Sequence, residues 1–152
     1  MQEEDADWVL ALSADNEIET SHLDAPSLQT MMADAFVADV VEPQAGYLIV
    51  FDETATYQSV NYLWFRARHA RFAYVDRIVV SAAARGLGLA RSLYENLFQR
   101  ARAAGHAMVC CEVNLDPPNP ASDAFHARLG FVEAGRATLP NGKTVRYMTA
   151  VL

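Results

Sequence analysis

The sequence predicts a single mixed α+β domain, residues 1–152, built around one central β-sheet. Three observations support this fold class. Apolar runs of strand length alternate with segments of helical periodicity along the chain. The long amphipathic segment Leu89–Ala103 separates two strand-like runs, which predicts a crossover between parallel strands. The chain ends in two further strand-like runs joined through Asn141-Gly142, a dipeptide typical of antiparallel hairpins.

The first third of the chain predicts two strands and one helix. Trp8–Leu12 is a short apolar run, interpreted as a strand. Asp24 suits the N-cap of a helix and Pro26 its first turn, and we expect this helix to continue to near Val40. Gly46–Phe51 is apolar at every position after its glycine, which predicts a buried strand.

A long connection, Asp52–Arg71, follows that strand. Its first part is polar and is interpreted as a loop. Asn61–His69 is rich in aromatic residues and predicts either a short helical turn or an irregular aromatic lid. A connection of this length is often functional, but it also fits a loop that carries a small separate aromatic cluster.

The second half of the chain has clearer signals. The helix Leu89–Ala103 has one apolar face, and Gly105 suits its C′ position. A loop, Asn114–Asn119, leads into a second helix that begins at Pro120 and ends at Gly130. The four strands expected here are Phe72–Ser81, Met108–Val113, Phe131–Thr138 and Thr144–Val151.

Charge is distributed unevenly. The first 65 residues contain 13 of the 19 acidic residues and no Lys or Arg, whereas the remainder contains all 12 Lys and Arg. A nucleic-acid-binding domain usually has a dominant basic face, so this distribution argues against one. It fits a protein whose C-terminal part holds a polyanion while its N-terminal part faces a cationic or neutral partner; it also fits an acidic surface kept for solubility.

Several features point to a cytoplasmic protein without a membrane segment or a metal. No apolar run approaches the ~18 residues of a membrane span, and the acidic N-terminus lacks the pattern of a signal peptide. Cys110 and Cys111 are adjacent, so neighbouring strand positions would direct them to opposite faces of a sheet. Neither has metal-ligand spacing, and both are interpreted as small core residues rather than nucleophiles.

One turn suggests a phosphate site. The strand that ends at Ser81 is followed by an Ala-rich turn and a helix. A glycine-containing helix N-terminus directs free backbone N–H groups and the positive end of the helix dipole to one point, which suits a pyrophosphate. By itself, the turn also fits an ordinary strand-to-helix connection. The residues of this segment are Arg85, Gly86, Leu87, Gly88, Leu89 and Ala90.

The segment matches neither of two common phosphate loops. No Gly-Lys-Ser/Thr follows, as a Walker loop requires, and its third small residue arrives one position too early for a dinucleotide fingerprint. Its order, Arg-x-x-Gly-x-Ala, resembles the pyrophosphate loop of the GNAT superfamily of acyl-CoA-dependent N-acyltransferases.

A second pattern supports the resemblance. In the family, an Asn is followed seven residues later by a Tyr and then, four residues after that, by Gly-Phe. By itself this pattern also fits an amphipathic helix ended by Gly and followed by a strand. The two motifs occur in the expected order, and the resemblance covers roughly residues 72–138. The matching residues here are Asn119, Ser122, Phe125, His126, Gly130 and Phe131.

The resemblance implies a fold and a co-substrate. Family members bind acyl-CoA, usually acetyl-CoA, where two parallel strands splay apart; here these would be Phe72–Ser81 and Met108–Val113. The pantetheine amides would pair with the backbone of Ile78 and Val80, as an added strand does. The N–H groups of residues 85–90 would hold the pyrophosphate. Asn119 matches a polar contact to the CoA arm, and Asn114 is a further candidate.

The resemblance also implies direct attack of an amine on the thioester. His126 stands where the family often has a Tyr that protonates the leaving sulfur, and His can donate or accept a proton near neutral pH. The backbone N–H of Val80 would hold the carbonyl oxygen. Asp76 is the expected base, because strict strand alternation places it on the same face as Ile78 and Tyr74. Its alternative role is an ion pair with a nearby arginine, and Glu112 is a further candidate base.

The acceptor is expected to be an amine of a small molecule or a peptide. Tyr62, Trp64 and Phe65 would form the walls of its site, with acids such as Glu17, Glu19 or Asp24 near the mouth. Two alternatives are an acyl group other than acetyl and a hydroxyl group as the acceptor. The alternative function is a catalytically silent acyl-CoA-binding sensor or interaction module. The edge strand of the terminal hairpin also suggests a possible homodimer.

Overall fold

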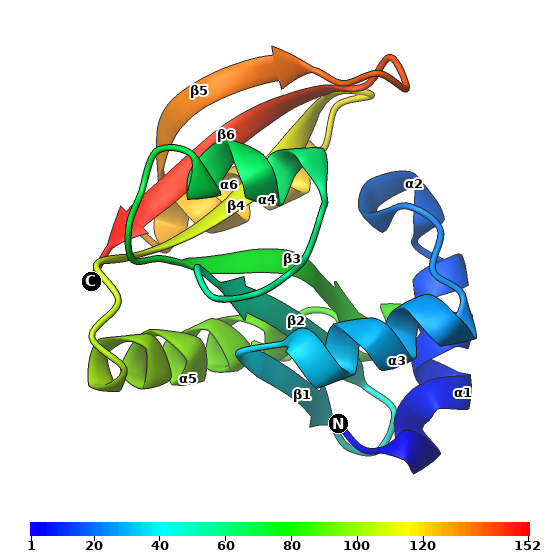
Figure 1. Cartoon of the computed structure of the whole chain (residues 1–152). Coiled ribbons are helices and arrows are strands. Elements are labelled where there is room, and N and C mark those ends of the chain that lie inside the picture. The colour runs from blue at the N-terminus through cyan, green and yellow to red at the C-terminus, as the bar shows by residue number, and fades with distance from the viewer.

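The computed structural model describes residues 1–152 and contains one six-stranded sheet in the order β1-β2-β3-β4-β6-β5 (Figure 1). The strands are β1 Val37–Val41, β2 Gly46–Asp52, β3 Ala73–Val80, β4 Met108–Asp116, β5 Val132–Thr138 and β6 Thr144–Val151. The helices are η1 Glu3–Asp5, α1 Ala6–Ala14, α2 Glu17–Thr20, α3 Ala25–Asp34, α4 Val60–Arg66, η2 Ala82–Ala84, α5 Leu89–Ala103 and α6 Pro120–Arg128.

The sheet is mixed, as the sequence predicts. β3 and β4 are parallel and are connected through α5, and every other neighbouring pair is antiparallel. A crossover helix is the usual way to connect adjacent parallel strands. The sheet therefore divides into an N-terminal part, β1–β3, and a C-terminal part, β4–β6, which meet at the β3–β4 pair.

Hydrophobic side chains fill the space on both faces of the sheet. One cluster lies on the side of α1, α3 and α4 and contains Tyr47, Ile49 and Phe51 of β2. The other lies on the side of α5 and contains Leu48 and Val50 of the same strand. β2 is thus buried at each of these positions, which confirms the strand predicted from its continuous apolar run.

The strand predicted at residues 8–12 is wrong, because this segment belongs to α1. Its buried side chains are Val9, Leu12 and Ser13, a helical spacing rather than an alternating one. Asp5 precedes the helix and accepts hydrogen bonds from the Gln2 amide and the Trp8 indole. A short apolar run does not distinguish helix from strand, and the long-range packing of Val9 and Leu12 decides for the helix.

The helix that begins after Asp24 ends at Asp34 rather than near Val40. Its start is as predicted: Asp24 caps it by accepting a hydrogen bond from the Ser27 amide at 2.8 Å. The residues predicted to end the helix instead form β1, which pairs antiparallel with β2 from Val37↔Val50 onward. Val-rich segments favour a strand when an edge is available for pairing, and β2 provides one.

The long connection after β2 contains a true helix, α4, capped by the Ser59 side chain. Tyr62 and Phe65 are fully buried in the cluster shared with α1 and α3, so the aromatic residues form part of the main core and not a separate cluster. Trp64 stacks on Tyr147 of β6 with ring centroids 4.2 Å apart. This helix therefore connects the two parts of the sheet on one face.

The second half of the chain follows the prediction closely, with one difference. Gly105 has φ of +78° just after the C-cap of α5, as its predicted C′ role requires. β4, however, continues to Asp116, so Asn114 lies in the strand and not in the following loop. The extension occurs because β6 pairs with β4 as far as Asp116↔Thr144. Cys110 and Cys111 are free and buried, as expected. None of the helices has the length and apolar character needed to cross a bilayer.

Candidate active site

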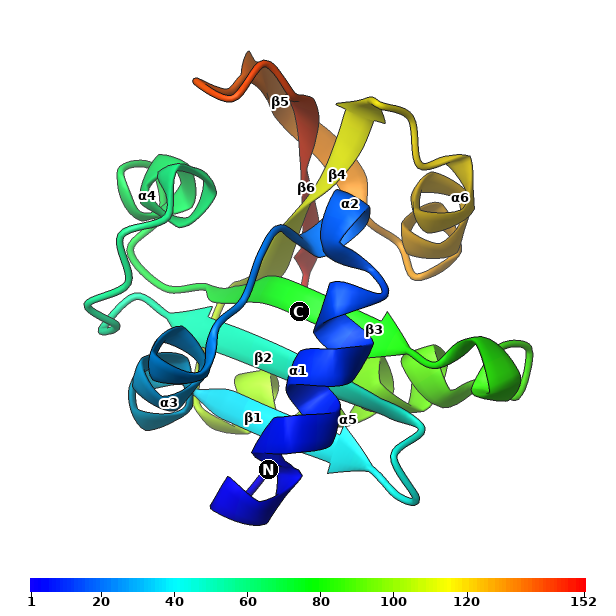
Figure 2. The same cartoon turned by 90° about the vertical axis from the view of Figure 1, so that its right-hand side faces the viewer.

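The two parallel strands pair only over their first residues. Pairing runs from Ala73↔Val109 to Val75↔Cys111, although β3 continues to Val80 and β4 to Asp116. Figure 2 shows β4 rising away from β3 beyond this point. Residues 76–80 of β3 therefore have no strand neighbour on the β4 side, and their backbone groups facing the gap have no sheet partner. The predicted splay is confirmed.

A small cavity of about 90 Å³ lies in this gap. It brings together residues of β3, β4 and α6 that were singled out from the sequence. They include Asp76, Ile78, Glu112, Asn114, Asn119 at the N-cap of α6 and His126 in its last turn. Tyr94 of α5 and Cys111 of β4, both buried, also line the cavity.

Asp76 does not share a face with Ile78, contrary to the sequence-based expectation. The register between β2 and β3 shifts here, so that Ile49 faces Arg77 and Val50 faces Val75. Asp76 is thus an extra residue in a β-bulge, which interrupts the alternation of side chains. Residues before and after the bulge change faces, because Tyr74 and Val79 belong to one cluster and Val75 and Ile78 pack in the other.

A second cavity, about 390 Å³, lies at the N-terminus of α5. Gly86 and Gly88 have φ of +80° and +79°, a conformation that favours glycine, and Gly88 is the N-cap of α5. Leu87 does not line the cavity and is 71% exposed. Of the predicted residues, this cavity gathers Val80, Arg85, Gly86, Gly88, Leu89 and Ala90.

Two cationic residues of this cavity were not anticipated. Arg91 lies in the first turn of α5, and Arg128 lies at the end of α6. They add positive charge to the cation already supplied by Arg85, whose side chain donates to Asn16 at 3.2 Å. Arg128 could not be assigned from the sequence, because only the fold brings the end of α6 beside the start of α5.

His126 is buried and its two ring nitrogens are both occupied. Nδ1 lies 2.8 Å from the Ser122 carbonyl, which can only accept, so Nδ1 carries the proton. Nε2 then accepts a hydrogen bond from the Tyr94 hydroxyl at 2.7 Å. Burial lowers the pKa of His126 and raises that of Tyr94 well above its usual range, so both groups are neutral near pH 7. In this arrangement the ring has no free proton to donate.

Asn119 and Asn114, the two predicted CoA contacts, also make hydrogen bonds within the protein. Asn119 caps α6 by accepting a hydrogen bond from the Ser122 amide at 3.1 Å. Asn114 points toward α2, where its side chain donates to the Ile18 carbonyl. Lys143, from the β5–β6 hairpin, donates to the same carbonyl at 2.7 Å. These bonds hold α2 over the gap between β3 and β4.

Two carboxylates lie at the point where the strands diverge, in different environments. Asp76 accepts from the Tyr57 hydroxyl at 2.7 Å and from Arg77 Nε at 2.9 Å, so its charge is paired. Glu112 accepts from Asn61 at 2.8 Å and from the Tyr74 hydroxyl at 2.8 Å, neither of which carries charge. Desolvation and the nearby Asp76 charge raise the pKa of Glu112 to about 8.

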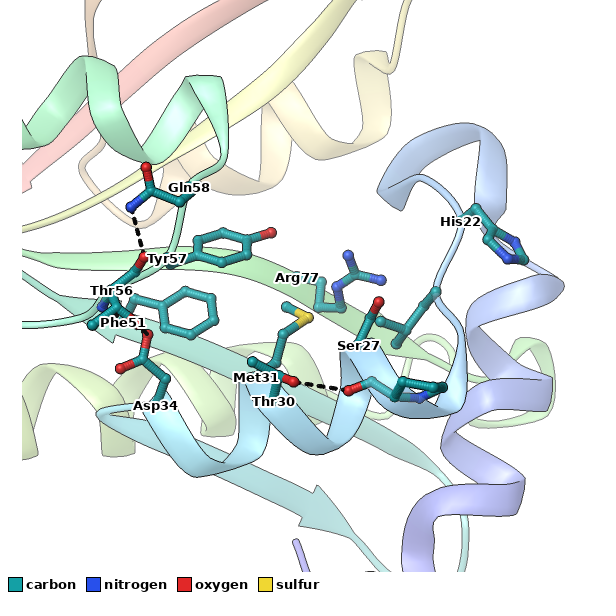
Figure 3. A pocket seen from close by; sticks show the side chains of 12 residues that line it. His22, Ser27, Thr30, Met31, Asp34, Phe51, Thr56, Tyr57, Gln58 and Arg77 are labelled. Atoms are coloured by element: carbon teal, nitrogen blue, oxygen red, sulfur yellow. Dashed lines mark hydrogen bonds between the residues drawn. The ribbon is translucent and has the colours of Figure 1, made fainter.

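Two further cavities lie on the side of the N-terminal helices, and the smaller of them reaches the two carboxylates. One, about 190 Å³, is lined by Glu112, Asp76 and Glu19 among others. The other, about 470 Å³, lies between α3 and the segment before α4 (Figure 3). The two share His22, Tyr57 and Arg77 as walls. In Figure 3, Tyr57 lies against Phe51, and Arg77 lies between Tyr57 and His22.

The aromatic residues that line these two cavities are not the ones expected from the sequence. Tyr62 and Phe65 are fully buried, and Trp64 packs against β6, so none of the three lines these cavities. Tyr57 and Phe51 take that place instead. Of the expected acids, Glu19 lines the smaller cavity, whereas Glu17 and Asp24 line neither. No group of three or more His, Cys, Asp or Glu residues is arranged to hold a metal ion.

Comparison with known proteins identifies the family. The model of the acetyltransferase (GNAT) family matches residues 12–131. Naa20 from Chaetomium thermophilum, in complex with a bisubstrate analogue, superposes with a TM-score of 0.77 at 19% identity, covering 100% of this chain and 84% of that one. The NatC complex bound to Gag peptide and CoA gives 0.73 at 14%, covering 99% and 92%.

A nourseothricin acetyltransferase is 25% identical, with a TM-score of 0.53, over 70% of this chain. The chain spans 57% of that protein's length. A search of curated proteins found no match. The family match covers well over half of the chain, and its two ends lie on either side of the splayed strands and the glycine turn. The chain therefore belongs to the GNAT family of acetyltransferases.

Proposed function

We propose that the protein transfers an acetyl group from acetyl-CoA to an amine of a small molecule or peptide, by direct attack within a ternary complex. One observation carries this proposal. The backbone of β3 without a strand partner lies between the glycine turn at the start of α5 and the carboxylate of Glu112. A donor site and a proton acceptor thus lie at opposite ends of one gap.

The residues of the gap fit a CoA thioester, which supplies the activated acyl group when bound. The backbone N–H groups of residues 85–90 and the dipole of α5 suit the pyrophosphate, and Arg91 and Arg128 add positive charge. Ile78 and Val80 lie in the part of β3 that lacks a strand neighbour toward β4, where pantetheine amides would find pairing partners. Asn114 and Asn119 line the same gap.

Glu112 is the base that the geometry supports best. An alkyl ammonium has a pKa near 10, so it must lose a proton before it can attack. A carboxylate with a pKa of about 8 is a much better proton acceptor at neutral pH than an ordinary one. Asp76, the base expected from the sequence, is paired with Arg77, and in this proposal its charge keeps the pKa of Glu112 high. Asp76 as the base is the alternative that the experiment tests.

His126 as the acid stays a prediction. To protonate the leaving sulfur, the ring would need a proton on Nε2 and would have to give up the bond from Tyr94. Its lowered pKa makes the protonated ring scarce at the pH where Glu112 is ionised. The hydrogen bonds and edge-on contacts with Tyr94 and Phe131 support a packing role for this side chain.

The acceptor would occupy the two cavities on the N-terminal side. Glu112 and Asp76 line the smaller cavity. The larger cavity, which shares walls with it, has apolar side chains together with Asp34 and Gln58. Acidic side chains favour a cationic amine. The second candidate function, a silent acyl-CoA-binding module, is favoured by one observation, the fully engaged His126.

An acetyl transfer assay distinguishes these possibilities. Thiol release from acetyl-CoA is measured across a panel of small amines and peptides, for the wild type and for Glu112→Gln, Asp76→Asn and His126→Phe. The proposal expects turnover that is lost mainly in Glu112→Gln. Turnover lost in Asp76→Asn but retained in Glu112→Gln assigns the base to Asp76. CoA binding without turnover of any acceptor supports the silent module.

A further inference from the structure

α4 brings a polar side chain to Glu112 from a distant part of the sequence. Asn61, on the first turn of α4, lies 51 positions before Glu112, yet its side-chain nitrogen donates to Glu112 Oε1 at 2.8 Å. The other carboxylate oxygen accepts from Tyr74 at 2.8 Å. Both oxygens of Glu112 are therefore held, one from α4 and one from β3.

The orientation of the Asn61 amide follows from its partners. An ionised carboxylate can only accept hydrogen bonds, so the amide nitrogen must face Glu112. The amide oxygen then accepts from the Tyr147 hydroxyl, at 3.0 Å. A flipped amide would place two acceptors together at Glu112, so the carboxylate sets the amide orientation. The Tyr147 hydroxyl takes the donor role toward the amide oxygen and thereby holds Asn61 in this orientation.

The position of α4 over Glu112 is set by packing against the C-terminal part of the sheet. The Trp64 ring stacks on Tyr147, and the Arg68 guanidinium lies 4.1 Å from the centre of the Trp64 ring. Trp64 also requires glycine at position 135 of β5, because a Cβ there would lie 2.8 Å from Trp64 Cζ2. Tyr147 therefore contributes both to the docking of the helix and to the orientation of Asn61.

We propose that Asn61, oriented by Tyr147, is a positioning residue that fixes the carboxylate of Glu112 for proton abstraction from the acceptor. Two of the four lone-pair positions of the carboxylate are occupied by Asn61 and Tyr74. The remaining positions are left for the acceptor in the cavity that Glu112 and Asn61 both line. This inference rests on the proposed function, in which Glu112 is the base.

The inference predicts a specific change in pH dependence. The bond from Asn61 favours the ionised form of Glu112, so Asn61→Ala should raise the pKa of Glu112 above about 8, by roughly one unit. The rate at pH 7 should then fall about tenfold and should approach the wild-type rate at high pH. Tyr147→Phe keeps the ring stacked on Trp64 and removes only the hydroxyl, so it should shift the midpoint in the same direction by less.

Two measurements are made on the full chain: the pH–rate profile with acetyl-CoA, and the titration of the Glu112 carboxyl by carbon NMR. Val60→Ala is the control, since Val60 lies on α4, is 54% exposed and should leave both midpoints unchanged. Raised midpoints in both measurements for Asn61→Ala support the inference. A carboxyl titration that shifts without a shift in the rate profile overturns it, because Glu112 is then not the base.

An unshifted carboxyl titration in both Asn61→Ala and Tyr147→Phe also overturns the inference, whatever the rates do. The NMR titration needs no acceptor, so it reports on Asn61 even if the wild type acetylates no amine. That separates failure of the inference from failure of the proposed function.

Discussion

The two ends of the β3–β4 gap are built in different ways. At the α5 end, the turn is made of backbone: Gly86 and Gly88 adopt left-handed conformations, and the arginines around them are on the surface. At the other end, Asn61 of α4 and Tyr74 of β3 donate hydrogen bonds to Glu112, and Tyr147 of β6 donates to Asn61. The first end suits recognition of a charged group by backbone amides. The second alters the proton affinity of one carboxylate through burial.

The difference predicts that substitutions at the two ends fail in different ways. Changes at Glu112 should affect the chemical step and leave CoA binding intact. Changes at the glycine turn should weaken CoA binding and leave the chemical step intact once CoA is saturating. Four predictions test this separation.

Glu112→Gln should have the largest effect. Gln keeps the size of the side chain but cannot accept a proton from the acceptor, so kcat should fall by ~10²-fold or more. The Kd for CoA, measured by calorimetry, should stay within about twofold of the wild type, since the substitution does not touch the cavity at the N-terminus of α5. Equal loss of CoA affinity and kcat would show that the two ends are not separate.

The stability of the fold should depend on pH through Glu112. The pKa of Glu112 in the folded state is about 8, above the ordinary value of 4.5. Between these two pH values Glu112 is therefore protonated in the folded state and ionised in the unfolded state. The free energy of unfolding should therefore fall as pH rises from 4.5 to 8, by at most a few kcal/mol. Denaturant unfolding at a series of pH values measures this slope, which should flatten in Glu112→Gln.

His126→Phe should affect stability more than catalysis. The Tyr94 hydroxyl would lose its acceptor while remaining fully buried, which costs about 1–3 kcal/mol. Adding Tyr94→Phe removes the unpaired hydroxyl and should restore most of that loss. Chemical denaturation measures both variants. The acid role would instead belong to His126 if kcat fell sharply in His126→Phe and the added Tyr94→Phe restored the stability but not kcat.

Gly88→Ala should have the smallest effect and should act on CoA binding. Its φ of +79° is costly for any residue with a Cβ, by about 1–2 kcal/mol, although the site has open space around it. A shift of the turn away from this conformation should weaken CoA binding up to about tenfold. Gly105→Ala is the matched control: its φ is +78°, but it lies at the other end of α5. It should lower stability by a similar amount without changing CoA affinity.

The sequence by itself determined the parts that depend on local patterns. Each of these parts follows from residues close together in the chain. They are the apolar strand β2, the helix α5 with Gly105 after it, the terminal hairpin and the two motifs. The glycine turn was predictable for the same reason: a strand end, two glycines and a helix start lie within one short segment.

Tertiary structure decided the remaining elements and the environment of Glu112, because these depend on contacts between residues that are far apart in the sequence. Val9 and Leu12 are helical since they pack into the core, and Val37–Val41 is a strand since β2 offers an edge. The bulge at Asp76 moved Ile78 to the other face, which strict alternation could not show. The proton affinity of Glu112 depends on burial, on Asp76 and on partners from β3 and α4, and only the folded chain brings these together.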